Sequence, residues 1–163
     1  MKTLISLPNW IKTQTPLQTI FWSGLMAGIL DAMAGVIVYY LYFHFNPFQV
    51  LESISSGIFG AKAINGSFIY VLIGLVLHFI IAFTAASILF LLFLKTDIYK
   101  FNPIILGLGY GLIIWLFMNL LVLPLSNYPK SPFDLGLASI GIAWHMILVG
   151  VPMTWIIWKY PRR

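Results

Sequence analysis

The stretch TIFWSGLMAGILDAMAGVIVYYLYF, residues 19–43, holds a single charged residue, Asp31, close to its middle. A run of about 20 apolar residues is long enough to cross the hydrocarbon core of a bilayer as a helix. A carboxylate at that depth costs roughly 2.5–3.5 kcal/mol on insertion scales, so it normally faces the interior of a helix bundle and has polar partners. The stretch therefore predicts a membrane-spanning helix, together with other helices that supply partners for Asp31.

The composition of the whole chain is that of a protein in lipid. Of its 163 residues 61% are hydrophobic and 8% are charged, and the mean hydropathy is +0.97. A soluble domain carries about 25% charged residues, so this chain has too little polar surface for water. The net charge of +5 comes from basic residues scattered through short hydrophilic breaks, which argues against nucleic acid as a partner. Because cysteine is absent, a thiolate metal site is excluded.

Four apolar stretches have the length of membrane spans. We predict an all-α integral membrane four-helix bundle in a single domain, residues 1–163, with spans at about 17–45, 66–94, 103–125 and 132–158. Three of these spans follow a cap residue and a Pro, namely Thr15-Pro16, Asn102-Pro103 and Ser131-Pro132. Pro152 lies inside the last span and should kink that helix near Leu148, because it removes one backbone hydrogen bond.

A shorter helix is predicted at 47–59, between the first two spans. It starts at Asn46-Pro47, and apolar residues recur in it at helical spacing with polar residues between them (Val50, Leu51, Ile54 and Ile58; Glu52, Ser53 and Ser56). The segment is too short and too polar to cross a bilayer. We therefore interpret it as an amphipathic helix that lies in the membrane interface.

The distribution of Lys and Arg predicts the orientation of the spans. Four spans put seven basic residues on one side of the membrane: Lys2, Lys12, Lys95, Lys100, Lys159, Arg162 and Arg163. Lys62 and Lys130 fall on the other side. Since positive residues favour the cytoplasm, this bias predicts that both termini are cytoplasmic and that the short helix lies on the outer face.

Small residues and polar residues share one face of each span. Residues four apart lie one above the other on a helix, which groups Gly24, Gly28 and Ala32 on the first span. Ala27 and Gly35 lie four residues either side of Asp31. The corresponding series on the other spans are Gly74, His78 and Ala82; Gly107, Gly111, Trp115 and Asn119; and Gly141 and His145. Small residues permit close approach of membrane helices, so these faces should meet.

Counting along the helices places three polar residues at similar depth. At 1.5 Å per residue, Asp31, His78 and His145 lie within roughly 5 Å of one level, and Asn119 lies nearer the outer end. We predict a polar mid-membrane cluster of Asp31, His78, His145 and Asn119. One possible role of such a cluster is purely structural, as a packing contact between helices. It can also carry a proton- or ion-linked path, because a His titrates near neutral pH.

Other functions are compatible with the same residues. His78 and His145 lie at similar depth on two helices that run in the same direction, the arrangement needed for bis-His ligation of haem b. A metal site of Asp31, His78 and His145 has acceptable ligand types. Our main prediction, however, is that the protein holds no metal. No motif places a nucleophile beside a base, so an enzyme is not predicted. An accessory or assembly subunit of a larger membrane complex, or a homo-oligomer, is a further alternative.

Several short motifs spread over residues 24–152 point to a family. They are Gly24-x3-Gly28-x2-Asp31, Pro47-x2-Val50-Leu51-x2-Ile54-x-Ser56-Gly57, Leu77-His78-Phe79, Gly109-Tyr110-Gly111, Met118-Asn119-x2-Val122-Leu123-Pro124-Leu125-Ser126 and His145-Met146-x2-Val149-Gly150-x-Pro152. With these motifs the chain resembles a group of uncharacterised, small four-helix bacterial inner-membrane proteins. The resemblance implies a bacterial inner-membrane location and brings no activity with it.

Overall fold

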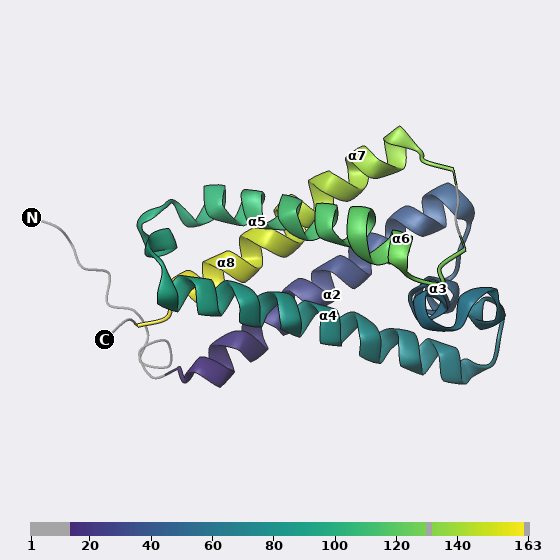
Figure 1. Ribbon diagram of the computed structural model, residues 1–163, viewed down its shortest axis with the longest axis horizontal. Helices are drawn as coiled ribbons and strands as arrows, with labels where there is room; N and C mark the ends of the chain where they lie inside the picture. The colour runs from purple at the N-terminus through teal and green to yellow at the C-terminus, as the bar shows by residue number, and fades with distance from the viewer. Residues whose placement is uncertain (1–13, 130–131, 162–163) are drawn as a thin grey trace, which may run out of the picture.

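The computed structural model describes residues 14–129 and 132–161, which are helical apart from short connections (Figure 1). In chain order the helices are α2 (Pro16–Phe43), α3 (Pro47–Phe59), α4 (Phe68–Lys95), α5 (Pro103–Phe117), α6 (Leu123–Leu125), α7 (Leu135–Trp144) and α8 (Val151–Trp158). Short 3-10 helices cover Gly60–Ala63 and Asp97–Lys100, and π turns at Met118–Val122 and His145–Gly150 join α5 to α6 and α7 to α8. The described residues contain no strand, and the predicted all-α class is confirmed.

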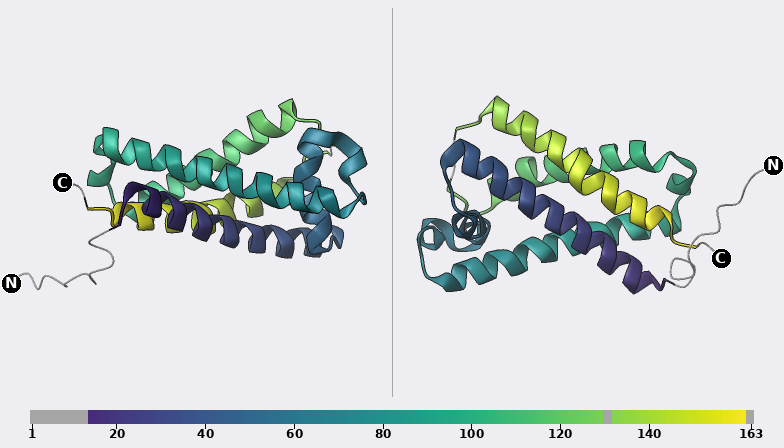
Figure 2. Two further views of the ribbon diagram at one scale, coloured as in Figure 1. Left: turned by 90° about the horizontal axis from the view of Figure 1, so that it is seen from below. Right: turned by 180° about the vertical axis from the view of Figure 1, so that it is seen from behind.

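Four continuous helices are long and apolar enough to cross a membrane: Pro16–Phe43, Phe68–Lys95, Pro103–Leu125 and Leu135–Trp158. Their ends lie within three residues of those predicted for the four spans, and the short helix matches its predicted range. The chain enters α2 and leaves α8 at one end of the bundle, and α3 crosses the opposite end (Figures 1 and 2). The predictions for Lys2, Lys12, Lys130, Arg162 and Arg163 lie outside the described residues.

The predicted N-caps of the first helices are present. The Thr15 hydroxyl accepts a hydrogen bond from the Gln18 backbone N–H at 3.3 Å, and the Gln18 side chain accepts one from the Thr15 N–H at 3.0 Å. Asn46 and Gln49 form the same reciprocal pair at the start of α3, with both distances 3.0 Å. These bonds satisfy backbone donors that the first turn leaves unpaired, so local sequence alone determines where these helices begin.

The start of the last span differs from its prediction. The helix begins at Leu135 rather than at residue 132, and Asp134 is its N-cap instead of its third residue. The Asp134 carboxylate accepts the Leu137 N–H at 2.7 Å. Asp is as good an N-cap as Ser, so two start signals three residues apart compete. Ser131, the predicted cap, lies outside the described residues.

Glycines hold the helices close together. A Cβ atom on Gly24 would lie 2.5 Å from the Phe83 ring, and one on Gly28 would lie 2.9 Å from the Phe79 ring, so both glycines seat aromatic rings of α4 against α2. On α5, a Cβ on Gly107 would lie 2.6 Å from the Val151 Cα, which places the α5 backbone directly on α8. The faces that small residues marked in the sequence are therefore contact faces.

Both π turns precede a proline inside a span. Met118–Val122 comes two residues before Pro124, and His145–Gly150 comes two residues before Pro152. Proline cannot donate to the carbonyl four residues back, and a widened turn is one way for a helix to accommodate that loss. At the place where a kink was predicted near Leu148, the structure thus has a π turn. Its first residue is His145.

The short helix α3 packs into the bundle and buries polar side chains beside the apolar Val50. Glu52, Ser55 and Ser56 are buried, whereas Phe48 and Ile58 are exposed. The buried groups are satisfied locally, because the Ser hydroxyls donate to α3 carbonyls and Glu52 Oε2 accepts the Asn65 N–H at 2.9 Å. The amphipathic pattern therefore predicted the helix, but its burial follows from contacts with α4 that the pattern does not contain.

Candidate functional site

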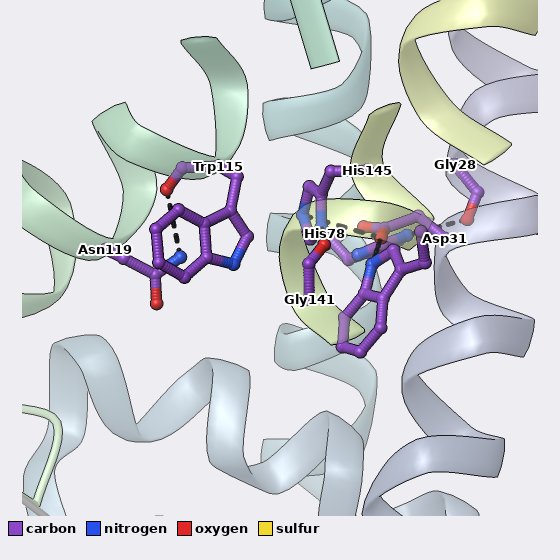
Figure 3. Close-up of polar contacts among 8 residues, drawn as sticks. Gly28, Asp31, His78, Trp115, Asn119, Gly141 and His145 are labelled. Carbon is purple, nitrogen blue, oxygen red and sulfur yellow. Dashed lines mark hydrogen bonds and ion pairs between the residues drawn. The ribbon is translucent and has the colours of Figure 1, made fainter. Parts of the chain in front are cut away.

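Asp31 has two partners from the far end of the chain. Its Oδ1 atom accepts a hydrogen bond from the Trp144 indole Nε1–H at 2.9 Å, and the same oxygen lies 3.7 Å from His145 Nε2 (Figure 3). The Asp31 and His145 side chains are 26% and 13% exposed. The structure therefore brings Asp31 and His145 together and adds an indole donor to the pair.

His145 is held in one orientation by its own helix. Its Nδ1 atom lies 2.8 Å from the Gly141 carbonyl oxygen, one turn earlier. A carbonyl only accepts hydrogen bonds, so Nδ1 must carry a proton. The neutral ring then presents the lone pair of Nε2 toward Asp31, and the charged ring presents an Nε2–H. The Asp31–His145 contact is consequently favourable when the two groups share one proton.

Backbone packing fixes the position of His145. A Cβ on Gly111 would overlap the His145 carbonyl oxygen and would lie 2.6 Å from the Met146 Cα, so α5 touches the backbone of the π turn. A Cβ on Gly141 would lie 2.6 Å from the Trp115 indole nitrogen. These contacts leave no room for rigid displacement of His145 toward α5.

His78 joins α4 to α2 one turn before Asp31. Its Nε2 atom lies 2.8 Å from the Gly28 carbonyl oxygen, and the side chain is buried. By the argument used for His145, Nε2 carries the proton, and Nδ1 of the neutral ring is an acceptor. His78 faces the same cavity as Asp31 and His145. Its described hydrogen bond, however, is to backbone rather than to either residue.

Asn119 takes no part in this group. Its side-chain amide donates to the Trp115 carbonyl oxygen at 2.9 Å, within its own helix (Figure 3). It is not among the residues that line the cavity. The sequence estimate already placed Asn119 nearer the outer end, and the π turn that starts at Met118 gives its amide a backbone carbonyl as partner.

A cavity of about 150 Å³ adjoins the Asp31–His145 pair. Its walls come from α2, α3, α4 and the junction of α7 with the π turn. The contribution of α3 consists of Val50, Leu51, Ser53 and Ile54, so the short helix closes one side of the site. Gly35 of α2 also lines it, and a Cβ there would meet no atom within 4 Å.

Sequence reasoning missed Trp144 and Tyr39 at this site. Both line the cavity, and neither was among the predicted site residues. A Trp in the middle of a span is a usable signal, because Trp in membrane helices is enriched at the interfaces. Trp144 stands beside His145 in the sequence and was available to this argument. Nothing local distinguishes Tyr39 from the exposed Tyr40 next to it.

The geometry does not favour a haem site. The cavity of about 150 Å³ is smaller than the roughly 300–1,000 Å³ of ordinary small-molecule pockets. Among residues 14–129 and 132–161, no group of three or more His, Cys, Asp or Glu residues is placed to hold a metal ion.

Neither a protein-family model nor a curated protein nor a solved structure matches this chain. The resemblance to small bacterial inner-membrane proteins therefore stays a prediction. What the site can do follows from its own chemistry, which is the binding and exchange of one proton between a carboxylate and an imidazole.

Proposed function

We propose that this chain is a non-enzymatic, multi-pass membrane protein in which Asp31 and His145 hold a proton at mid-membrane depth and exchange it during proton-linked transport. The observation that carries the proposal is the 3.7 Å separation of Asp31 Oδ1 and His145 Nε2. Four long apolar helices support the membrane location. The basic residues of the sequence support cytoplasmic termini, and the resemblance supports the bacterial inner membrane.

The Asp31–His145 pair carries no net charge when it holds one proton. A carboxylate beside an imidazolium and a carboxylic acid beside a neutral imidazole both carry one proton and no net charge. Loss of that proton leaves an uncompensated carboxylate among apolar helices, which is costly in a low-dielectric environment. The Trp144 N–H stabilises the carboxylate form, since hydrogen bonds to ionised acceptors are strong. A site of this kind takes up and releases protons one at a time.

The Asp31–His145 pair is the main proton-exchanging unit, because most other titratable groups nearby are engaged in bonds elsewhere. His78 from α4 and Tyr39 from α2 are the other titratable residues that line the cavity. Glu52 of α3 accepts the Asn65 N–H, and the Tyr110 hydroxyl of α5 donates to the Ala85 carbonyl at 2.7 Å. His78 is a candidate second carrier, because its bond to the Gly28 carbonyl leaves one ring nitrogen for proton exchange.

The test is proton movement in liposomes. Wild-type protein reconstituted with an internal pH-sensitive dye should relax an imposed pH gradient faster than protein-free liposomes do, and Asp31→Asn should reduce the rate to that of protein-free liposomes. Asparagine keeps the shape and an acceptor for Trp144 but cannot carry the proton.

A matched control is Asp97→Asn. Asp97 forms an ion pair with Lys100 at 2.8 Å in which both side chains are mostly exposed, so its neutralisation should leave the rate unchanged. Equal rates for wild-type, Asp31→Asn and protein-free liposomes would refute proton-linked transport.

A further inference from the structure

The cavity beside Asp31 is rich in hydrogen-bond acceptors because its donors are already used. Four side chains that line it donate to acceptors of the protein itself: Trp144 to Asp31, His145 to Gly141, His78 to Gly28 and Ser53 to Val50. The last of these bonds measures 2.7 Å. The described residues of the wall therefore offer a ligand few free donors, and Tyr39 supplies the one hydroxyl for which no bond is described.

The acceptors that remain belong to the same side chains. Asp31 Oδ2 has no described hydrogen bond, and each neutral imidazole keeps one ring nitrogen as an acceptor. The Ser53 oxygen keeps its lone pairs after donating to Val50. A carboxylate among neutral acceptors is complementary to a cation that carries several N–H donors. Hard metal cations are less suited, because they prefer a full shell of oxygen ligands.

The remaining walls suit a short alkyl chain. Val36 of α2 and Val50, Leu51 and Ile54 of α3 are aliphatic, and the Trp144 ring borders the same space. An apolar cavity of about 150 Å³ is large enough for benzene, so the cavity admits an ammonium group with a few carbon atoms. Aromatic rings additionally attract cations.

We propose that this cavity binds a short-chain primary alkylammonium ion, with its ammonium group on Asp31 and its alkyl chain against α3. The inference rests on the proposed function, because it names the ligand of the same site. Charge balance couples the binding of the cation to the release of the proton. When the cation arrives, the proton of the Asp31–His145 pair leaves to water, the carboxylate keeps one positive partner, and neutral His145 keeps its bond to Gly141.

Calorimetry on the purified protein in mild detergent tests the proposal with ethylammonium chloride as the probe. We expect saturable binding, with sodium chloride giving no response at the same ionic strength. Tetramethylammonium has the same charge but no N–H donor, so it should bind at least about tenfold more weakly, a difference of about 1.4 kcal/mol. In weakly buffered solution, ethylammonium should release protons in proportion to the amount bound.

Two glycine variants show whether binding occurs in this cavity. Gly35→Leu places its side chain in open space, so it should fill the cavity, preserve the fold and weaken ethylammonium binding at least about tenfold. Gly109→Leu is the matched control, because Gly109 is exposed on α5 and a Cβ there also meets no atom within 4 Å. It should bind as wild-type does.

The outcomes separate this inference from the proposed function. Absence of ethylammonium binding, equal binding of tetramethylammonium, or unchanged binding in Gly35→Leu would each overturn the inference, whatever the liposome assay gives. Binding that Gly35→Leu abolishes, in a protein that moves no protons in liposomes, would retain the ligand site and refute proton-linked transport.

Discussion

Gly111→Ala is expected to lower the free energy of unfolding by about 2–3 kcal/mol, the upper range for an overpacked core. The added Cβ overlaps the His145 carbonyl oxygen and approaches the Met146 Cα to 2.6 Å. Both atoms belong to backbone, so no side-chain rotation relieves the overlap, and α5 must move away from the π turn. Unfolding by SDS in mixed micelles, followed by circular dichroism, measures this loss.

Gly109→Ala is the control for this effect, two residues away on the same helix. Its Cβ meets no atom within 4 Å, and alanine has the higher helix propensity, so the variant should be neutral or up to about 1 kcal/mol more stable. Equal stabilities of the two variants would show that α5 does not contact the His145 backbone as described.

Gly74→Ala is expected to displace α3 from the bundle. Its Cβ overlaps the Leu51 carbonyl oxygen and lies 2.7 Å from the Leu51 carbonyl carbon. Because α3 forms one wall of the cavity, its displacement should abolish ethylammonium binding and expose the α3 amides. Hydrogen exchange measured by mass spectrometry should be faster over residues 47–59 than in wild-type. The exchange rate should rise about tenfold for each 1.4 kcal/mol of docking free energy that is lost.

The control for α3 is Gly57→Ala, on α3 itself. A Cβ there would lie 3.8 Å from the Ser126 Cβ, an ordinary contact. Protection of α3 should therefore match wild-type. Unchanged protection in Gly74→Ala would contradict the docking of α3 on α4.

Much of the fold was predictable because its determinants are local or periodic. The Thr15–Gln18 and Asn46–Gln49 caps depend on residues three apart, and span length follows from hydropathy. The glycine series predicted contact faces because a residue without a side chain permits close approach of whichever helix packs against it. The start at Leu135 was less predictable, since two cap signals three residues apart competed there.

The site was predictable only in part. Depth along the helices was sufficient to predict that Asp31 and His145 lie at one level, and the structure has them 3.7 Å apart. Which indole would reach Asp31, and that α3 would cover the site, depend on helix rotation and on contacts between distant segments. Asn119 lies apart from the pair, because a polar residue on a small-residue face can bond to its own helix.

Nitrogen-15 NMR of the histidine rings tests most directly whether Asp31 and His145 share a proton. Spectra of labelled protein in lipid should show His145 Nδ1 protonated, because it donates to the Gly141 carbonyl. The Nε2 resonance should differ between wild-type and Asp31→Asn, because the carboxylate that lies 3.7 Å from Nε2 in wild-type is gone. An unprotonated Nδ1, or the same Nε2 resonance in both proteins, would contradict the shared proton.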